Sequence, residues 1–210
     1  GTVGNGLLTF DLVSKKYEIP YTELNRKLFE NKTISTLMME GNSRLWLGTT
    51  ASGLYVYDFK TKKIDHWEKG ISTSSLRYNH VTHIHQDRKN RIWVLTNGGG
   101  LHLYQGPGNV FKIFTVADGL VSNTLRGMVE DKKGNLWVGT SANGIALFSK
   151  KSNKFQFFIT KIPSNKVLFL KFLDENTLFV STEDKGVYLL NLKNKQITSI
   201  KIEGKERSFV

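Results

Sequence analysis

Three histidines that lie close together in the chain, His80, His83 and His85, are the residues best suited to metal binding. His83 and His85 are two residues apart, so in a strand their side chains share one face. A metal ion also needs further ligands in a fitting geometry, and the sequence offers none near these histidines. We therefore expect histidines that pack against a neighbouring element or form hydrogen bonds, with neither a metal nor another cofactor.

The glycine run Gly98–Gly100 has the composition of a phosphate-binding loop. A P-loop continues with Lys and Ser or Thr and opens a helix, and neither feature follows here, so we expect a tight turn. A lyase or glycosidase needs acids and bases that converge at one site. The acids that would face such a site are scattered and form no recognisable pair, which argues against an enzyme: Glu68, Asp118, Glu183 and Asp184.

Composition excludes further classes of chemistry. The 210 residues contain no cysteine, which removes disulfides, thiolate catalysis and Cys-type zinc sites. No apolar run approaches the roughly 20 residues that span a bilayer. The first residues lack the basic start and apolar stretch of a signal peptide, so we expect a cytoplasmic chain or a targeting segment outside this sequence. The net charge of +12 keeps anionic partners open.

A sequence repeat positions these residues. Segments 36–58, 83–105 and 127–149 align without a gap; a fourth copy, 169–191, aligns from Leu178 onward and is expected to be one residue shorter in its first turn. A period of about 40–50 residues built from short strands is typical of a β-propeller. Each copy carries an anchor aromatic and, at constant spacing after it, a glycine: Trp46, Trp93, Trp137 and Phe179, then Gly53, Gly100, Gly144 and Gly186.

Each repeat predicts four antiparallel strands, A to D, joined by polar turns and short Gly-containing loops. We expect an all-β fold, a β-propeller of four-stranded antiparallel blades that here forms a partial ring of about four and a half blades. Because a ring must close to satisfy its edge strands, further residues or a neighbouring chain are expected to complete it. The expected divisions are the second half of a blade (1–22), four blades (32–68, 79–116, 123–160 and 165–202) and the start of a further blade (207–210).

The third repeat, NTLRGMVEDKKGNLWVGTSANGIALF, resembles the two-component regulator propeller repeat in its Asn before strand A, its acidic pair, Gly-Asn-Leu-Trp and Gly-Thr. The linker FTVADGLVSN resembles that family's connection between strand D and the next strand A. Repeat four departs from the pattern at Phe179 and Ser181, and repeat two at Leu95. The resemblance implies a non-enzymatic periplasmic sensor region, joined in its parent chain to further blades and to a histidine kinase or transcription module. Several members respond to oligosaccharides.

A ligand is expected on the face formed by the B–C and D–A loops, because loops on a rigid scaffold carry binding residues. Sugar recognition needs amide and guanidinium groups and an exposed aromatic ring. Residues of these kinds occur at roughly equivalent places in successive blades: Arg77, Tyr78, Asn97, Arg126, Asn143 and Asp184. Asn79, Asn123 and Asn165, which precede strand A, are expected to bond the turn backbone. Most of the surplus positive charge falls on the opposite, A–B and C–D, face, where we interpret it as solvated lysines.

Three functions remain open at this point. The preferred one is a periplasmic ligand-sensing propeller of a two-component regulator that responds to an oligosaccharide. The second is a propeller for protein–protein interaction or homodimerisation without a small ligand. The third is a propeller lyase or glycosidase. Nucleic-acid binding is not expected, because the basic turns lack a coherent stripe with interleaved aromatics, and neither is membrane insertion.

Overall fold

The computed structural model describes residues 1–3, 6–18, 31–72, 74–107, 110–152, 154–158 and 162–200. The expected start of a further blade at 207–210 lies outside the described residues, as does the end of the expected half blade at 19–22. Among the described residues, no helix has the length and apolarity that crossing a membrane requires.

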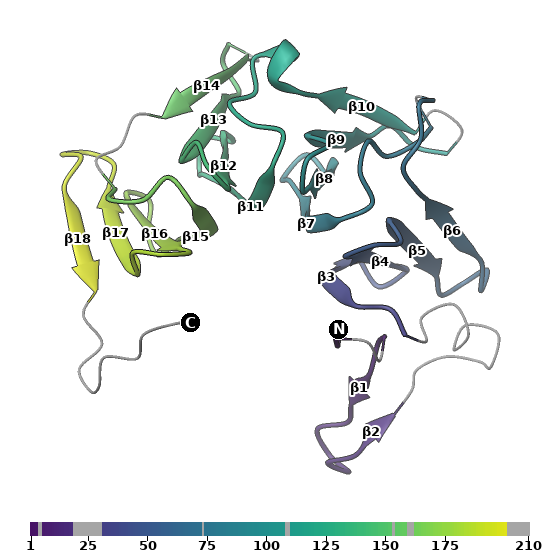
Figure 1. The fold of residues 1–210 in the computed structure, drawn as a ribbon. Coiled ribbons are helices and arrows are strands. Elements are labelled where there is room, and N and C mark those ends of the chain that lie inside the picture. The colour runs from purple at the N-terminus through teal and green to yellow at the C-terminus, as the bar shows by residue number, and fades with distance from the viewer. Residues whose placement is uncertain are drawn as a thin grey trace.

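Four sheets of four antiparallel strands follow one another along the chain, and in each sheet the strands pair in chain order (Figure 1). The first blade contains β3 (Ile34–Glu40), β4 (Arg44–Thr49), β5 (Leu54–Asp58) and β6 (Ile64–Trp67). The second contains β7 (Val81–Gln86), β8 (Ile92–Thr96), β9 (Leu101–Tyr104) and β10 (Phe111–Phe114). The third contains β11 (Leu125–Glu130), β12 (Leu136–Thr140), β13 (Ile145–Ser149) and β14 (Lys154–Phe158). The fourth contains β15 (Val167–Phe172), β16 (Thr177–Thr182), β17 (Val187–Asn191) and β18 (Ile197–Ile200).

The blades stand side by side in an open arc, with the first strand of each blade on the inside and the last on the outside (Figure 1). A two-stranded ribbon, β1 (Thr9–Phe10) with β2 (Tyr17–Glu18), precedes the first blade. A single 3₁₀ turn, Val116–Asp118, interrupts the β-structure of the described chain. The predicted all-β partial propeller is confirmed.

Apolar clusters between neighbouring blades hold the arc together. Trp46 of the first blade is fully buried against Val81 and Ile84 of the second, and Trp93 of the second against Met128 of the third. Trp137 lies likewise against the fourth blade. Burying a large aromatic side chain contributes on the order of 2–3 kcal/mol, so these anchors supply much of the cohesion between blades.

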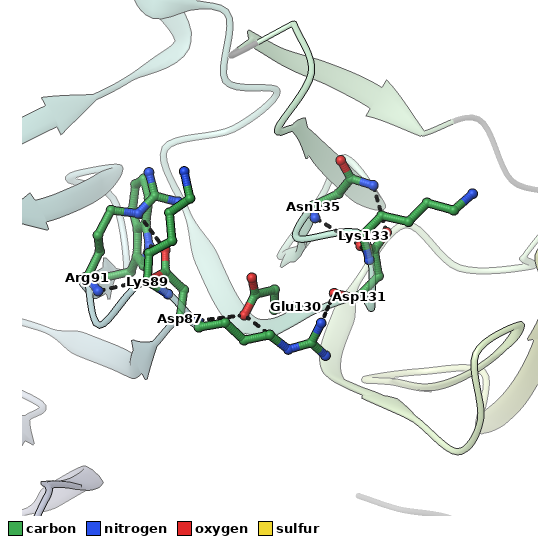
Figure 2. A network of polar contacts seen from close by, with 9 residues as sticks. Asp87, Lys89, Arg91, Glu130, Asp131, Lys133 and Asn135 are labelled. Atoms are coloured by element: carbon green, nitrogen blue, oxygen red, sulfur yellow. Dashed lines mark hydrogen bonds and ion pairs between the residues drawn. The ribbon is translucent and has the colours of Figure 1, made fainter.

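Buried acids organise the turns between strands A and B. Asp87 accepts hydrogen bonds at one oxygen from the backbone of Lys89 and Arg91, and at the other from the Arg91 guanidinium and the Trp93 indole, all within 2.6–3.0 Å. Asp131 repeats this arrangement in the third blade, and Figure 2 shows both turns. Burial alone would raise the pKa of Asp87, but the bonds from Trp93 and Arg91 outweigh it and hold the pKa below its ordinary value.

The fourth blade lacks this arrangement, and the expectation of a shorter turn there is wrong. Phe172 pairs with Leu178 just as Glu130 pairs with Leu136, so the two turns have the same length. Leu173 stands where Asp131 stands in the third blade, and Phe179, which replaces Trp, has no indole N–H to donate. Because the acid and the tryptophan are both replaced, the sequence of this turn no longer resembles the other three, although its length is the same.

An irregularity in the first strand of every blade shapes its inner end. The pairing register shifts at the same place in β3, β7, β11 and β15. The residue at the shift turns toward a neighbour: Ser35 donates its hydroxyl to the Val81 carbonyl at 2.5 Å, and Thr82 donates to the Leu125 carbonyl at 2.8 Å. Arg126 occupies this position in the third blade, which places a guanidinium at the inner edge of the B–C and D–A face.

Candidate ligand-binding face

A threonine at the end of each strand B shapes the B–C loops. Its hydroxyl donates to the carbonyl of the repeat glycine at 2.7–2.9 Å, and it accepts a loop N–H in return. The repeat glycines adopt positive φ, from 66° to 85°, which favours glycine over residues with a β-carbon. Thr2 makes the same bond to Gly6. Each B–C loop is therefore a rigid platform at the end of its blade.

The D–A linkers are fastened by one buried aliphatic residue and one asparagine. Leu76 and Leu120 are buried in the clusters between blades, three residues before Asn79 and Asn123 respectively. The Asn79 side chain accepts the Lys69 N–H, and Asn123 accepts the Val116 N–H. Both asparagines thus bond the local backbone, the role that the sequence predicts for them. The linkers are held at both ends.

The glycine run of the second blade packs under the first of these linkers. A β-carbon on Gly99 would lie 2.9 Å from both the Arg77 β-carbon and the Tyr78 nitrogen, so only glycine fits. The Tyr78 ring lies over Gly98, at 3.6 Å from where a β-carbon would be. The N–H groups of Gly98 and Gly100 donate to the Asn123 carbonyl, and that of Gly99 donates to the Thr96 hydroxyl. These amides are engaged within the fold and are not presented to a phosphate.

Arg77 and Tyr78 present their side chains from this fixed backbone. The Arg77 side chain points to solvent, and Tyr78 is 42% exposed. The Lys69 ammonium lies 5.9 Å from the centre of the Tyr78 ring and adds a further donor beside it. The Arg77 N–H donates at 3.1 Å to Nε2 of His102, a fully buried residue of β9. His102 therefore anchors the segment that carries both side chains.

A second cluster of polar residues lies at the inner ends of β7 and β11. Asn97 Nδ2 is 3.2 Å from His80 Nδ1, and the backbone of Asn97 pairs with that of Thr124 in an isolated β-bridge. Arg126 donates from Nε to the Ser141 hydroxyl at 2.7 Å. Burial and then the nearby Arg126 charge lower the pKa of His80, which keeps this imidazole neutral near pH 7.

The six residues singled out from the sequence fall into separate groups. Asn97 directly precedes Gly98 and Gly99, on which Arg77 and Tyr78 lie, and it pairs in an isolated β-bridge with Thr124, two residues before Arg126. The structure thus brings Arg77, Tyr78, Asn97 and Arg126 to one region of the face. Asn143 lies in the B–C loop of the third blade, where its N–H donates to Thr140. Asp184 lies in that of the fourth blade and accepts the Ser164 hydroxyl at 2.5 Å.

The histidines of β7 pack against the third blade. His83 bonds the backbone of Met128 on β11, and burial lowers its pKa to about 4. The His83 and His85 rings are 6.3 Å apart, and Nε2 of His85 is buried with no hydrogen-bond partner among the residues that the structure describes. No group of three His, Asp or Glu side chains that could hold a metal ion occurs in the described part of the chain.

Sequence reasoning missed three contributors to this region. His80 was expected to pack or to form a hydrogen bond, but its partner, Asn97 of the adjacent loop, was not identified. Ser141 directly follows the Gly-Thr pair of strand B. Thr50 and Asn97 occupy the equivalent position in the first two blades, so a polar residue at this point was recognisable from the repeat. His102 lies within an apolar strand and gave none, because its partner comes from a linker 25 residues away.

Two segments of the chain, 75–98 and 119–142, match the family model described as the two-component regulator propeller. They cover the linker, strand A and strand B of the second and third blades. The chain carries two-component regulator propeller repeats. The family suggested by the third repeat is thereby confirmed, and the Arg77, Tyr78 and Asn97 region falls within the first of the matched repeats.

Several solved structures have a fold similar to that of this chain. Two extracellular domains, of proteins described as hybrid two-component systems of B. thetaiotaomicron, are similar with TM-scores of 0.72 and 0.69 at 19% and 18% identity. They cover 84% and 80% of this chain, which spans 25% of each of them. Virginiamycin B lyase from Staphylococcus aureus is similar with a TM-score of 0.63 at 14% identity, covering 81% of this chain and 56% of its own. At such identities the likeness shows the fold. The search of curated proteins found no match.

Proposed function

We propose that the chain is part of the extracellular or periplasmic sensor region of a two-component regulator and that it binds an oligosaccharide on its B–C and D–A face. The observation that carries the proposal is the grouping of Arg77, Tyr78, Asn97 and Arg126 within and beside a matched regulator repeat. Guanidinium and amide groups bond sugar hydroxyls, and a half-exposed tyrosine ring offers a stacking surface. Output would come from other domains of the parent chain.

Rigidity supports this assignment. The backbone of 76–79 is held by the buried Leu76, by His102 and by the glycine platform, while the side chains of Arg77 and Tyr78 remain free of that task. A preformed site loses little conformational entropy when a ligand binds. The residues that hold the backbone are distinct from those that would touch the ligand, so the two roles are separable by mutation.

Exposed apolar residues at the ends of the arc favour further blades as partners. Leu37 of the first blade is 39% exposed, whereas Ile84 and Met128, at the same register position in the next two blades, are each 4% exposed. At the other end Phe169 is 45% exposed. We propose that additional blades of the parent chain cover these faces. A homodimer that covers them is the second candidate function.

Replacing Arg77 and Tyr78 by alanine is expected to weaken oligosaccharide binding at least about tenfold while leaving the unfolding free energy within about 1 kcal/mol of native. The His102 bond uses the backbone N–H of Arg77, which alanine retains. The measurement is the melting temperature against a panel of neutral oligosaccharides, followed by calorimetric titration of those that raise it. Lys63→Ala, an exposed cation in a C–D turn on the opposite face, is the matched control. Undiminished affinity in the double variant would remove this region from the site.

A further inference from the structure

A separate hollow of about 180 Å³ lies on the opposite, A–B and C–D, face, between the second and third blades. One acid, Glu130, lines it. Six cations line it as well, and they come from the two A–B turns and from the start of the third blade's C–D turn: Arg88, Lys89, Arg91, Lys132, Lys133 and Lys150. Surplus lysines that the sequence places in solvated turns thus converge here on one hollow.

The turns that present these cations are rigid. Asp87 and Asp131 fix the backbone of Lys89 and Lys133 at equivalent points of the two blades (Figure 2). Arg88 ties the blades together, because its N–H donates to Glu130 and its guanidinium donates to the Asp131 carbonyl. Cationic side chains on a fixed backbone bind an anion more strongly than side chains that must first be ordered.

Three of these six cations are already paired with acids. Arg91 pairs with the buried Asp87, Lys132 with Glu175, and Arg88 with Glu130 at 3.9 Å. In the described structure Lys89, Lys133 and Lys150 form no ion pair. Three ammonium groups beside a hollow with one lining carboxylate repel one another, and a compact anion bound among them would relieve that repulsion.

A glycine leaves room for the Lys150 side chain beside the hollow. A β-carbon on Gly134 would lie 2.9 Å from Lys150 Cδ and 3.3 Å from its Nζ, so the absence of that carbon lets the lysine lie across the turn. The Lys150 N–H is held by the Asn135 side chain at 3.0 Å. Lys150 is exposed, and its side chain lies across the A–B turn beside the hollow.

A larger hollow of about 360 Å³ borders the first across Lys132 and Lys133, between the third and fourth blades. Leu147, Phe158 and Trp137 form its apolar floor, and polar residues that include the acids Asp131 and Glu175 line the rest.

We propose that these adjoining hollows bind an organic phosphate or sulfate monoester, with the anionic group among Lys89, Lys133 and Lys150 and the organic group over the apolar floor. Ammonium groups bind phosphate and sulfate oxygens by charge-assisted hydrogen bonds. This site lies on the face opposite to the proposed oligosaccharide site, so the two stand or fall independently.

The test uses phenyl phosphate, phenyl sulfate, inorganic phosphate and phenol at constant ionic strength, with affinity measured by calorimetric titration. Phenyl phosphate or phenyl sulfate should bind roughly tenfold more tightly than inorganic phosphate or phenol, and added salt should weaken the binding. The tighter of the two esters identifies the anionic group. Lys89→Ala with Lys150→Ala should reduce ester affinity by roughly tenfold or more. The matched control, Lys60→Ala with Lys63→Ala, removes two exposed lysines from the same face and should leave it unchanged.

Two results would overturn the proposal. One is ester binding no tighter than that of inorganic phosphate or phenol. The other is equal ester affinity in the native protein and in the Lys89 and Lys150 double variant. All four lysines are exposed, so unchanged melting temperatures without ligand will show that the variants fold.

Discussion

Replacing Asp87 by alanine is expected to lower the free energy of unfolding by about 3 kcal/mol. The substitution removes the acceptor of four hydrogen bonds in a turn where Asp87 is 2% exposed. It leaves the Trp93 indole N–H unpaired in the cluster between blades, and it leaves the Arg91 guanidinium without its partner. Urea denaturation near pH 7 measures the loss.

Asp174→Ala in the fourth blade is the matched control. Asp174 is exposed, and among the described residues it accepts hydrogen bonds from Asn176 and Thr177, with no indole and no arginine. Its removal should cost far less stability than removal of Asp87. Equal losses for the two variants would show that turn geometry, and not the buried acid–indole bond, is what the repeat preserves.

The second large effect is a loss of stability in mild acid that His102 causes. Burial lowers the pKa of His102 to about 4, from an ordinary value of 6.5. Between about pH 6.5 and pH 4 the His102 imidazole therefore stays neutral in the folded chain, whereas in the unfolded chain it binds a proton. The stability from neutral His102 is fully present above pH 6.5 and is lost as the pH falls toward 4, by about 1.4 kcal/mol per pH unit.

His102→Gln isolates this contribution, because glutamine can still accept the Arg77 N–H but does not titrate in this range. Between about pH 7 and pH 4.5 the native protein should lose about 2.5 kcal/mol of unfolding free energy relative to the variant. Urea denaturation at each pH gives both values. A difference that stays constant with pH would mean that His102 is not the group responsible.

Strand positions and blade order were predictable because the same pattern recurs four times and each recurrence checks the others. The anchor tryptophans mark strand B in three blades, and the glycine after each marks the entry to strand C. The fourth turn was misread for a physical reason. Leu173 replaces the acid and Phe179 replaces the tryptophan, so the bond that makes this turn recognisable is absent while its length is unchanged.

The ligand face was predictable only in part. Propeller topology puts B–C and D–A loops on one face, which is why Arg77, Tyr78 and Asn97 were expected together and lie together. The support from His102 was not foreseeable, since it is a contact between a buried strand and a distant backbone N–H. The convergence of Lys89 and Lys150 on one hollow likewise depends on side-chain directions across two blades, which spacing does not encode.

Hydrogen–deuterium exchange of the protein with and without the neutral oligosaccharide that stabilises it most is the most direct test of the proposed oligosaccharide site. Exchange should slow in 76–80, 97–100 and 124–126, the backbone that carries the proposed site and its neighbours. Protection confined to the opposite turns, 87–91 and 131–135, would contradict it, as would a panel in which no oligosaccharide stabilises the folded protein.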